Sequence, residues 1–121
     1  AQATFARIRK SDVHGIVVPR SLSLNIPGLA MEATTHQGIP TMFFGPWYVE
    51  NGGLASYGSA FYESGRQAAR LVDKILKGTN PGEIPVEVNN NIEFVINFKI
   101  AQALRIKIAP EMLSRATRII R

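Results

Sequence analysis

The chain has 121 residues, of which 45% are hydrophobic and 19% charged, and it contains no cysteine. This composition is that of a globular protein, and no apolar run approaches the ~20 residues of a membrane-spanning helix. The absence of cysteine excludes disulfides and thiolate metal sites. The formal net charge is +5, but the basic residues are scattered and lack interleaved aromatic residues. We therefore predict no nucleic-acid partner.

The first half of the chain alternates predicted strands and helices. Apolar runs predict three buried strands of a parallel sheet, at 13–19, 39–44 and 54–57. The uninterrupted Ile16-Val17-Val18 is typical of a strand buried on both faces. Residues 4–11 have the spacing of a helix end, and 20–24 form a polar connection. Asn25 can cap a helix that Gly38 ends, and 45–53 predict a turn with a short helical segment.

The stretch from Phe61 to Gly78 predicts a long amphipathic helix. Its apolar residues recur at the three-and-four spacing of one helix face: Phe61, Gly65, Ala68, Ala69, Val72, Ile75 and Leu76. Charged residues lie mainly on the opposite face, and Gly78 supplies the stop. The other predicted elements leave this helix without a sufficient partner. We expect its inner face to pack on sequence outside this chain, and the isolated chain to self-associate.

The pattern changes after Gly78. Residues 79–85, with two prolines and a glycine, predict an exposed connector. The remaining predicted elements are strands at 86–88 and 93–98 and helices at 99–105 and 109–121. The turn-prone run Asn89-Asn90-Asn91 between the two strands permits a hairpin. The order of elements is that of an α/β fold with a mostly parallel sheet.

Residues that could carry catalysis are sparse. His14 and His36 are far apart in the sequence and have no carboxylate at the spacing of a metal site. The chain has no GxSxG elbow, Walker A loop or GxGxxG turn, and its nine carboxylates are dispersed. We therefore expect neither an enzyme nor a bound metal or cofactor.

Polar and aromatic residues follow each of the first three predicted strands. Pro19–Ser23 follow the first strand, Phe44–Tyr48 the second and Ser56–Ser59 the third. Parallel strands end at one edge of a sheet, where α/β proteins bind ligands. Apolar walls with a few directed polar groups are typical of a small-molecule cleft, although Trp47 and Tyr57 can also serve as core packing. The predicted ligand-binding residues are Arg20, Ser21, Ser23, Gly45, Pro46, Trp47, Ser56 and Tyr57.

Long, ordered motifs then carry a resemblance to one bacterial family. They include YG-x-x-F-Y-E-x-G-R-Q-A-A at the start of the long helix, F-V-I-N-F-K-x-A-x-A-L, and I-A-P-E-M-L-x-R-A near the end. The chain resembles the C-terminal portion of ABC transporter substrate-binding proteins of the type I periplasmic-binding fold. Within that family it is similar to tryptophan- and phenylalanine-binding lipoproteins.

The resemblance implies a two-lobed protein with a ligand cleft between three-layer, Rossmann-like lobes joined by crossing strands. Residues 1–57 would belong to the C-terminal lobe, 58–85 would be a crossover helix and connector, and 86–121 would return as strands and helices. Tyr57 and Gly58 would then be hinge residues as well as cleft lining. The chain would be one part of a longer protein and would bind ligand weakly or not at all by itself, because one wall of the cleft would be missing.

The resemblance also implies a function and a cellular location. Such a protein captures an amino acid or similar small molecule and delivers it to an ABC permease, in the periplasm or anchored outside the membrane. The family often has an acidic residue where this chain has Ser21, and the neighbouring Arg20 favours an anionic ligand. Type I sensor domains share the fold, so the effector-binding domain of a transcription regulator is an alternative. A flavodoxin-like enzyme domain is disfavoured because the phosphate loop is missing.

Overall fold

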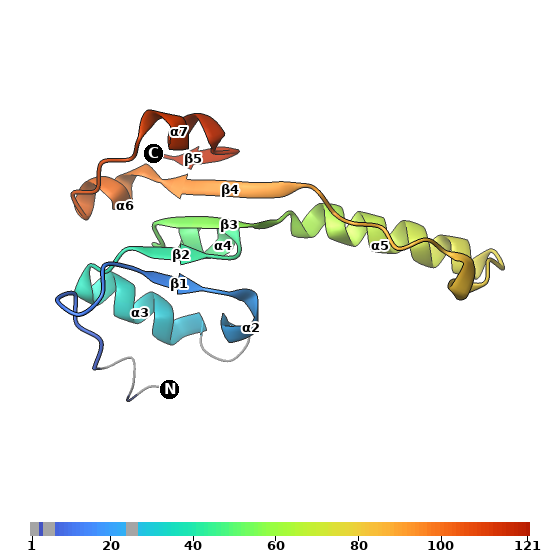
Figure 1. Ribbon diagram of the computed structural model, residues 1–121, viewed down its shortest axis with the longest axis horizontal. Coiled ribbons are helices and arrows are strands. Elements are labelled where there is room, and N and C mark those ends of the chain that lie inside the picture. The colour runs from blue at the N-terminus through green and yellow to red at the C-terminus, as the bar shows by residue number, and fades with distance from the viewer. Residues whose placement is uncertain (1–2, 4–6, 24–26) are drawn as a thin grey trace. The chain divides into compact units, whose positions relative to one another are not determined.

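The computed structural model describes residues 3, 7–23 and 27–121. It divides into two compact units, which we call unit 1 (residues 1–58 and 93–121) and unit 2 (residues 59–92). The division of the chain after residues 57 and 85, which the family resemblance implies, stays a prediction. Chain connectivity shows that one strand leads out of unit 1 near Gly58 and another returns near Glu93 (Figure 1).

Unit 1 is built on a five-stranded sheet with strand order β1-β2-β3-β4-β5 (Figure 1). The strands are β1 Ile16–Val18, β2 Thr41–Phe43, β3 Ala55–Ser59, β4 Ile92–Asn97 and β5 Arg118–Ile120. β1, β2 and β3 are parallel neighbours, with Val18 opposite Phe43 and Phe43 opposite Ser56. β4 and β5 are also parallel, with Ile96 opposite Ile119. The predicted α/β fold with a mostly parallel sheet is confirmed.

Helices cover both faces of this sheet. They are α2 Arg20–Ser23, α3 Pro27–Gln37, α4 Pro46–Glu50, α6 Phe98–Ala103 and α7 Pro110–Arg115. On one face, Val18 and Phe43 pack with Ala30 of α3 and Tyr48 of α4. On the other face, Ala55, Phe94 and Ile96 pack with Leu113 of α7. Adjacent strand residues point to opposite faces, so unit 1 has the three-layer arrangement that the sequence predicts.

Unit 2 consists of the long helix α5, Phe61–Leu76, and the segment that returns along it. Gly78 has a φ of +99° just after the helix, which permits the turn that ends it, as predicted. A short 3₁₀ helix, η1 Pro81–Glu83, lies within the predicted connector. The extended residues 87–91 then run beside α5, where Asn89 Nδ2 donates to Ser64 Oγ over 2.7 Å and to the Ala60 carbonyl over 3.3 Å.

Two predictions near the C-terminus are wrong. Residues 86–88 form no strand and no hairpin, because Glu87 and Asn89 face α5 through side-chain bonds while Val86 and Val88 are 96% and 74% exposed. β4 lies between β3 and β5 instead. The predicted helix at 109–121 is only α7, and Arg118–Ile120 form β5. Ala116 already has extended backbone angles at the helix end, and the β-branched Ile119-Ile120 pair with β4.

The first part of the chain also departs from its predictions. Arg20–Ser23, expected as a polar connection, form α2. Val17 is 71% exposed, so β1 is not buried on both faces; it is an edge strand of this sheet. Residues 7–11 form turns and irregular structure rather than a helix, and residues 4–6 lie outside the described part. Asn25, the expected helix cap, also lies outside the described residues. α3 begins at Pro27, and Gly38 (φ +61°) follows its end as predicted.

Candidate functional site

The candidate ligand-binding residues follow the ends of β1, β2 and β3. Arg20 and Ser21 are exposed in α2, directly after β1. Gly45 is extended (φ −151°) before Pro46, whose fixed φ suits the first position of α4. Ser23 ends α2, but its side chain lies outside the described part. Because β1, β2 and β3 are parallel, these segments follow the same edge of the sheet.

The segment after β2 forms an aromatic cluster. The rings of Phe43 and Tyr48 are stacked at 4.7 Å with an angle of 6° between their planes. Phe44 and Trp47 also contact Tyr48, at centroid distances of 5.2 and 5.1 Å. Trp47 nevertheless stays 60% exposed. An indole that packs on one side and is open on the other can serve as the wall of a ligand site.

Tyr57 resembles Trp47 in this respect. Its ring meets that of Phe94 at 5.9 Å, edge to face, and the side chain is 53% exposed. Neither Tyr57 nor Trp47 is therefore a core residue of the described structure. Their roles as ligand-wall residues stay predictions.

Ser56 lies inside β3, within the strand predicted at 54–57, and Gly58, expected after that strand, also lies inside β3. The strand continues to Ser59, two residues beyond its predicted end. Ser56 is fully buried, and its Oγ has no hydrogen-bond partner in the described part of the chain. Gly58 passes so close to Phe44 that an added Cβ would collide with the Phe44 carbonyl oxygen. Gly58 is also the last residue of unit 1 before the chain enters unit 2, which is compatible with a hinge.

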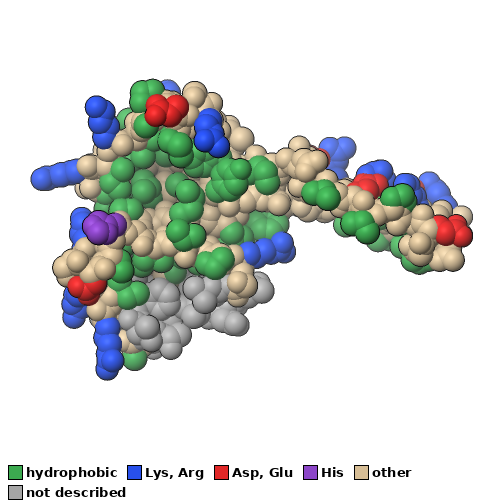
Figure 2. Space-filling model, viewed as in Figure 1, with side chains coloured by type: hydrophobic (Ala, Val, Ile, Leu, Met, Phe, Trp, Pro, Cys, Tyr) green, Lys and Arg blue, Asp and Glu red, His purple; other side chains and the backbone are tan. Residues whose placement is uncertain are grey.

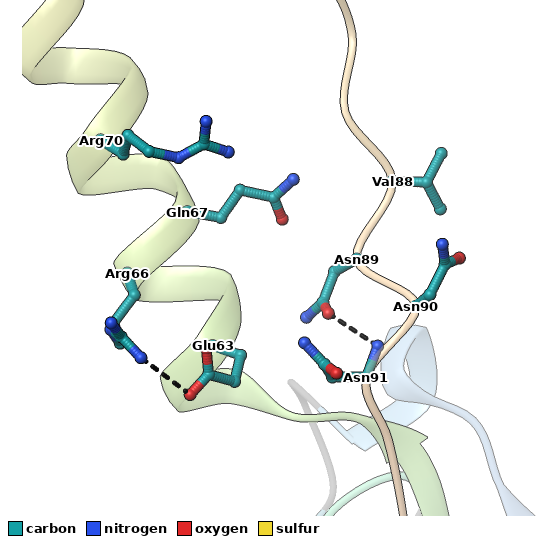
Figure 3. A pocket seen from close by; sticks show the side chains of 8 residues that line it. All are labelled: Glu63, Arg66, Gln67, Arg70, Val88, Asn89, Asn90 and Asn91. Atoms are coloured by element: carbon teal, nitrogen blue, oxygen red, sulfur yellow. Dashed lines mark hydrogen bonds and ion pairs between the residues drawn. The ribbon is translucent and has the colours of Figure 1, made fainter.

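A polar hollow in unit 2 was not predicted. It has a volume of about 500 Å³ and lies between α5 and the returning segment (Figure 3). Glu63, Arg66, Gln67 and Arg70 line it from the helix, at the spacing of one helix face, and Asn89–Asn91 line it from the other side. Arg66 pairs with Glu63 at 3.5 Å, and Arg70 pairs with Glu87. The hollow is therefore rich in hydrogen-bonding groups while its charges are largely balanced.

Contacts between α5 and the returning segment shift the pKa of one titratable group, Glu87. Gln67 Nε2 donates to Glu87 Oε2 over 3.0 Å, and the Arg70 guanidinium lies beside the same carboxylate. The hydrogen bond from Gln67, together with the positive charge of Arg70, lowers the pKa of Glu87 below its ordinary value. The carboxylate therefore holds the returning segment against α5 in its ionised form.

Other kinds of site find little support among the described residues. No group of three or more His, Cys, Asp or Glu side chains there could hold a metal ion. Within the described part, no helix is both long and apolar enough to cross a membrane. On the face of unit 1 visible in Figure 2, the Lys and Arg side chains stand singly rather than as one patch.

Comparison with known proteins decides the family. The family model for ABC transporter substrate binding protein matches residues 2–120. This chain belongs to that family. The resemblance in the sequence motifs is thereby confirmed. No curated protein matches the chain.

Solved structures agree with the family. A conserved domain protein from Vibrio cholerae is 29% identical, with a TM-score of 0.84. The ABC domain from Streptococcus pneumonia, solved in complex with L-Trp, is 26% identical, with a TM-score of 0.78. A ligand-free, open substrate-binding protein with adhesive properties from Clostridium difficile is 20% identical with a TM-score of 0.60, which shows the fold alone. Each comparison covers 98% of this chain and 40% of the other.

As a member of the ABC substrate-binding family, the chain has the periplasmic-binding-protein fold of these structures. It spans about 40% of the length of the solved relatives. The sheet edge formed by the ends of β1, β2 and β3 is the part of unit 1 where the predicted binding residues gather.

Proposed function

We propose that this chain forms one wall of the inter-lobe cleft of a solute-binding protein that serves an ABC importer. The cleft captures an amino acid or similar small molecule and the protein delivers it to a permease, without chemistry of its own. The observation that carries the proposal is the family match over residues 2–120. The relative with L-Trp bound supports an amino-acid ligand. A periplasmic or extracellular, membrane-anchored location belongs to the same proposal.

The proposed wall consists of Arg20 and Ser21, the α4 start with Trp47, and Tyr57. Trp47 and Tyr57 offer half-open rings to an apolar side chain. The Arg20 guanidinium favours a carboxylate as the polar group of the ligand. Gly45, Pro46 and Ser56 contribute by shaping the backbone of this edge, and Tyr57 and Gly58 act as the hinge.

An NMR titration of the chain with each of the twenty amino acids tests the proposal. Binding is followed through the assigned backbone amide signals of the chain. We expect weak binding, in the millimolar range because much of the cleft lies outside this chain, with shifts at Ser21, Trp47 and Tyr57. Trp47→Ala should abolish these shifts. Tyr62→Ala, which removes an even more exposed aromatic ring from unit 2, should leave them intact. Binding that shifts only residues elsewhere, or no binding at all, would contradict the proposed wall.

A further inference from the structure

A second hollow, distinct from the polar hollow of unit 2, lies in unit 1. It is at the opposite edge of the sheet from the proposed ligand wall. It has a volume of about 110 Å³ and lies where β2 begins, where the chain enters β3 and where α6 ends. Ile39 and Thr41, both at least 97% buried, line it. The half-buried Leu54, Ile100 and Leu104 form its walls. None of the predicted ligand-binding residues lines it.

The interior of this hollow is apolar in its chemistry. Two hydroxyls border it, and both already donate to backbone carbonyls: Thr41 Oγ1 to Ile39 over 3.2 Å and Thr35 Oγ1 to Met31 over 2.8 Å. Their protons are therefore not available to a ligand. A polar group placed here would lose its hydrogen bonds to water without replacement, so the hollow selects apolar groups.

The size of the hollow limits the group that fits. An engineered apolar cavity of about 150 Å³ accepts benzene. A hollow of about 110 Å³ therefore suits a branched alkyl group or a single small ring, and excludes a polycyclic one.

A positive charge lies near this hollow. A Cβ built on Gly38 would lie 3.5 Å from Leu104 Cδ2 and 3.7 Å from Lys10 Nζ, so the Lys10 ammonium group and the Leu104 wall both lie near Gly38. Arg105, exposed, follows Leu104 directly. Within the described part of the chain, Lys10 forms no ion pair with a carboxylate. A carboxylate on a ligand would supply that partner.

We propose that this hollow binds a small carboxylate with a branched alkyl or phenyl tail, the tail in the hollow and the carboxylate at Lys10. The site is separate from the proposed cleft wall, so this proposal can be tested independently of the importer function.

The probe for this site is 4-methylpentanoate, titrated into the chain and followed by NMR of the methyl groups. We expect saturable shifts at Ile39, Leu54 and Leu104 at concentrations on the order of 10 mM. The neutral 4-methylpentanamide should bind about three-fold more weakly, since an exposed ion pair contributes modestly. Adamantane-1-carboxylate, which has the charge but exceeds the volume, should not bind.

Two variants separate the tail contact from the charge contact. Ala103 is exposed on α6 at the rim, so Ala103→Leu fills the hollow without removing a core group and should weaken 4-methylpentanoate at least about ten-fold. Lys10→Gln should weaken it about three-fold. Gln102→Leu, exposed on the same helix but outside the hollow, is the matched control and should change nothing. Absence of saturable shifts, unchanged affinity in Ala103→Leu, or equal binding of the acid and the amide would overturn the proposal.

Discussion

Gly58 of β3 lies directly against the backbone carbonyl of Phe44. A Cβ added at Gly58 would stand well within 3.0 Å of the Phe44 oxygen, a distance that real Cβ contacts do not reach. Backbone atoms cannot move aside as a flexible side chain can, so only glycine fits this position of β3. The close approach joins the end of β3 to the segment that leads into the aromatic cluster.

Gly58→Ala should therefore destabilise unit 1 by about 3 kcal/mol or more, because β3 must separate from Phe44 to admit the methyl group. Chemical denaturation followed by tryptophan fluorescence measures the loss. Gly65→Ala is the matched control: its Cβ meets nothing within 4 Å, and alanine in a helix interior should add up to about 1 kcal/mol. Equal stability of the two variants would contradict the assigned contact.

Ser56→Ala is expected to leave the free energy of unfolding unchanged or to raise it by up to about 1 kcal/mol. The Ser56 hydroxyl is buried without a partner in the described part of the chain, and such a group carries a desolvation cost. Thr41→Val removes a buried hydroxyl that does donate a hydrogen bond and should cost about 1 kcal/mol. A loss of more than about 1 kcal/mol in Ser56→Ala would reveal a partner for this hydroxyl.

Asn97→Ala should cost roughly 2–4 kcal/mol. The buried Asn97 side chain donates to the Val49 carbonyl over 3.1 Å and accepts from the Ile100 N–H over 3.1 Å, where it caps α6. Its removal leaves a carbonyl and an N–H without these partners. Asn90→Ala, at an exposed position in unit 2, should stay within about 0.5 kcal/mol. Thermal unfolding of both variants makes the comparison, and a similar small effect in both would refute the role of Asn97.

The attachment of residues 87–91 to α5 should weaken in acid. The pKa of Glu87 is lowered in the folded chain, so its contribution is fully present above the ordinary glutamate pKa and is lost as pH falls through the lower, folded value. Gln67→Ala should raise the pKa of Glu87 toward its ordinary value, as seen by carboxyl NMR titration. Gln102→Ala in α6 should leave it unchanged. An unaltered Glu87 titration in Gln67→Ala would show that this hydrogen bond is not the main cause.

The isolated chain should self-associate through the apolar face of α5. Val72, Ile75 and Leu76 are exposed there, Leu76 by 81%. Leu76→Lys should reduce the average mass in light scattering at high concentration, because it places a charge on that face. Glu111→Gln makes the same change in net charge on α7 and should have no effect. A monomer for the parent chain at every concentration would contradict the prediction.

The sequence by itself determined the elements whose patterns are local. The helical spacing from Phe61 to Leu76, the stop at Gly78 and the short helical segment within 45–53 are all present as predicted, because they depend on neighbours within a few residues. The strand runs near Ile16 and Thr41 and the family motifs were likewise sufficient to give the fold class.

Only the tertiary structure decided which extended segments become strands. Residues 86–88 look like a strand but bond to α5 through side chains, whereas Arg118–Ile120 look helical yet pair with β4. The burial of Ser56, the closeness of Gly58 to Phe44 and the hollow lined by Leu54 and Leu104 each depend on segments far apart in the chain. Strand pairing and close backbone approach require a partner that local sequence does not specify, so these features follow from packing alone.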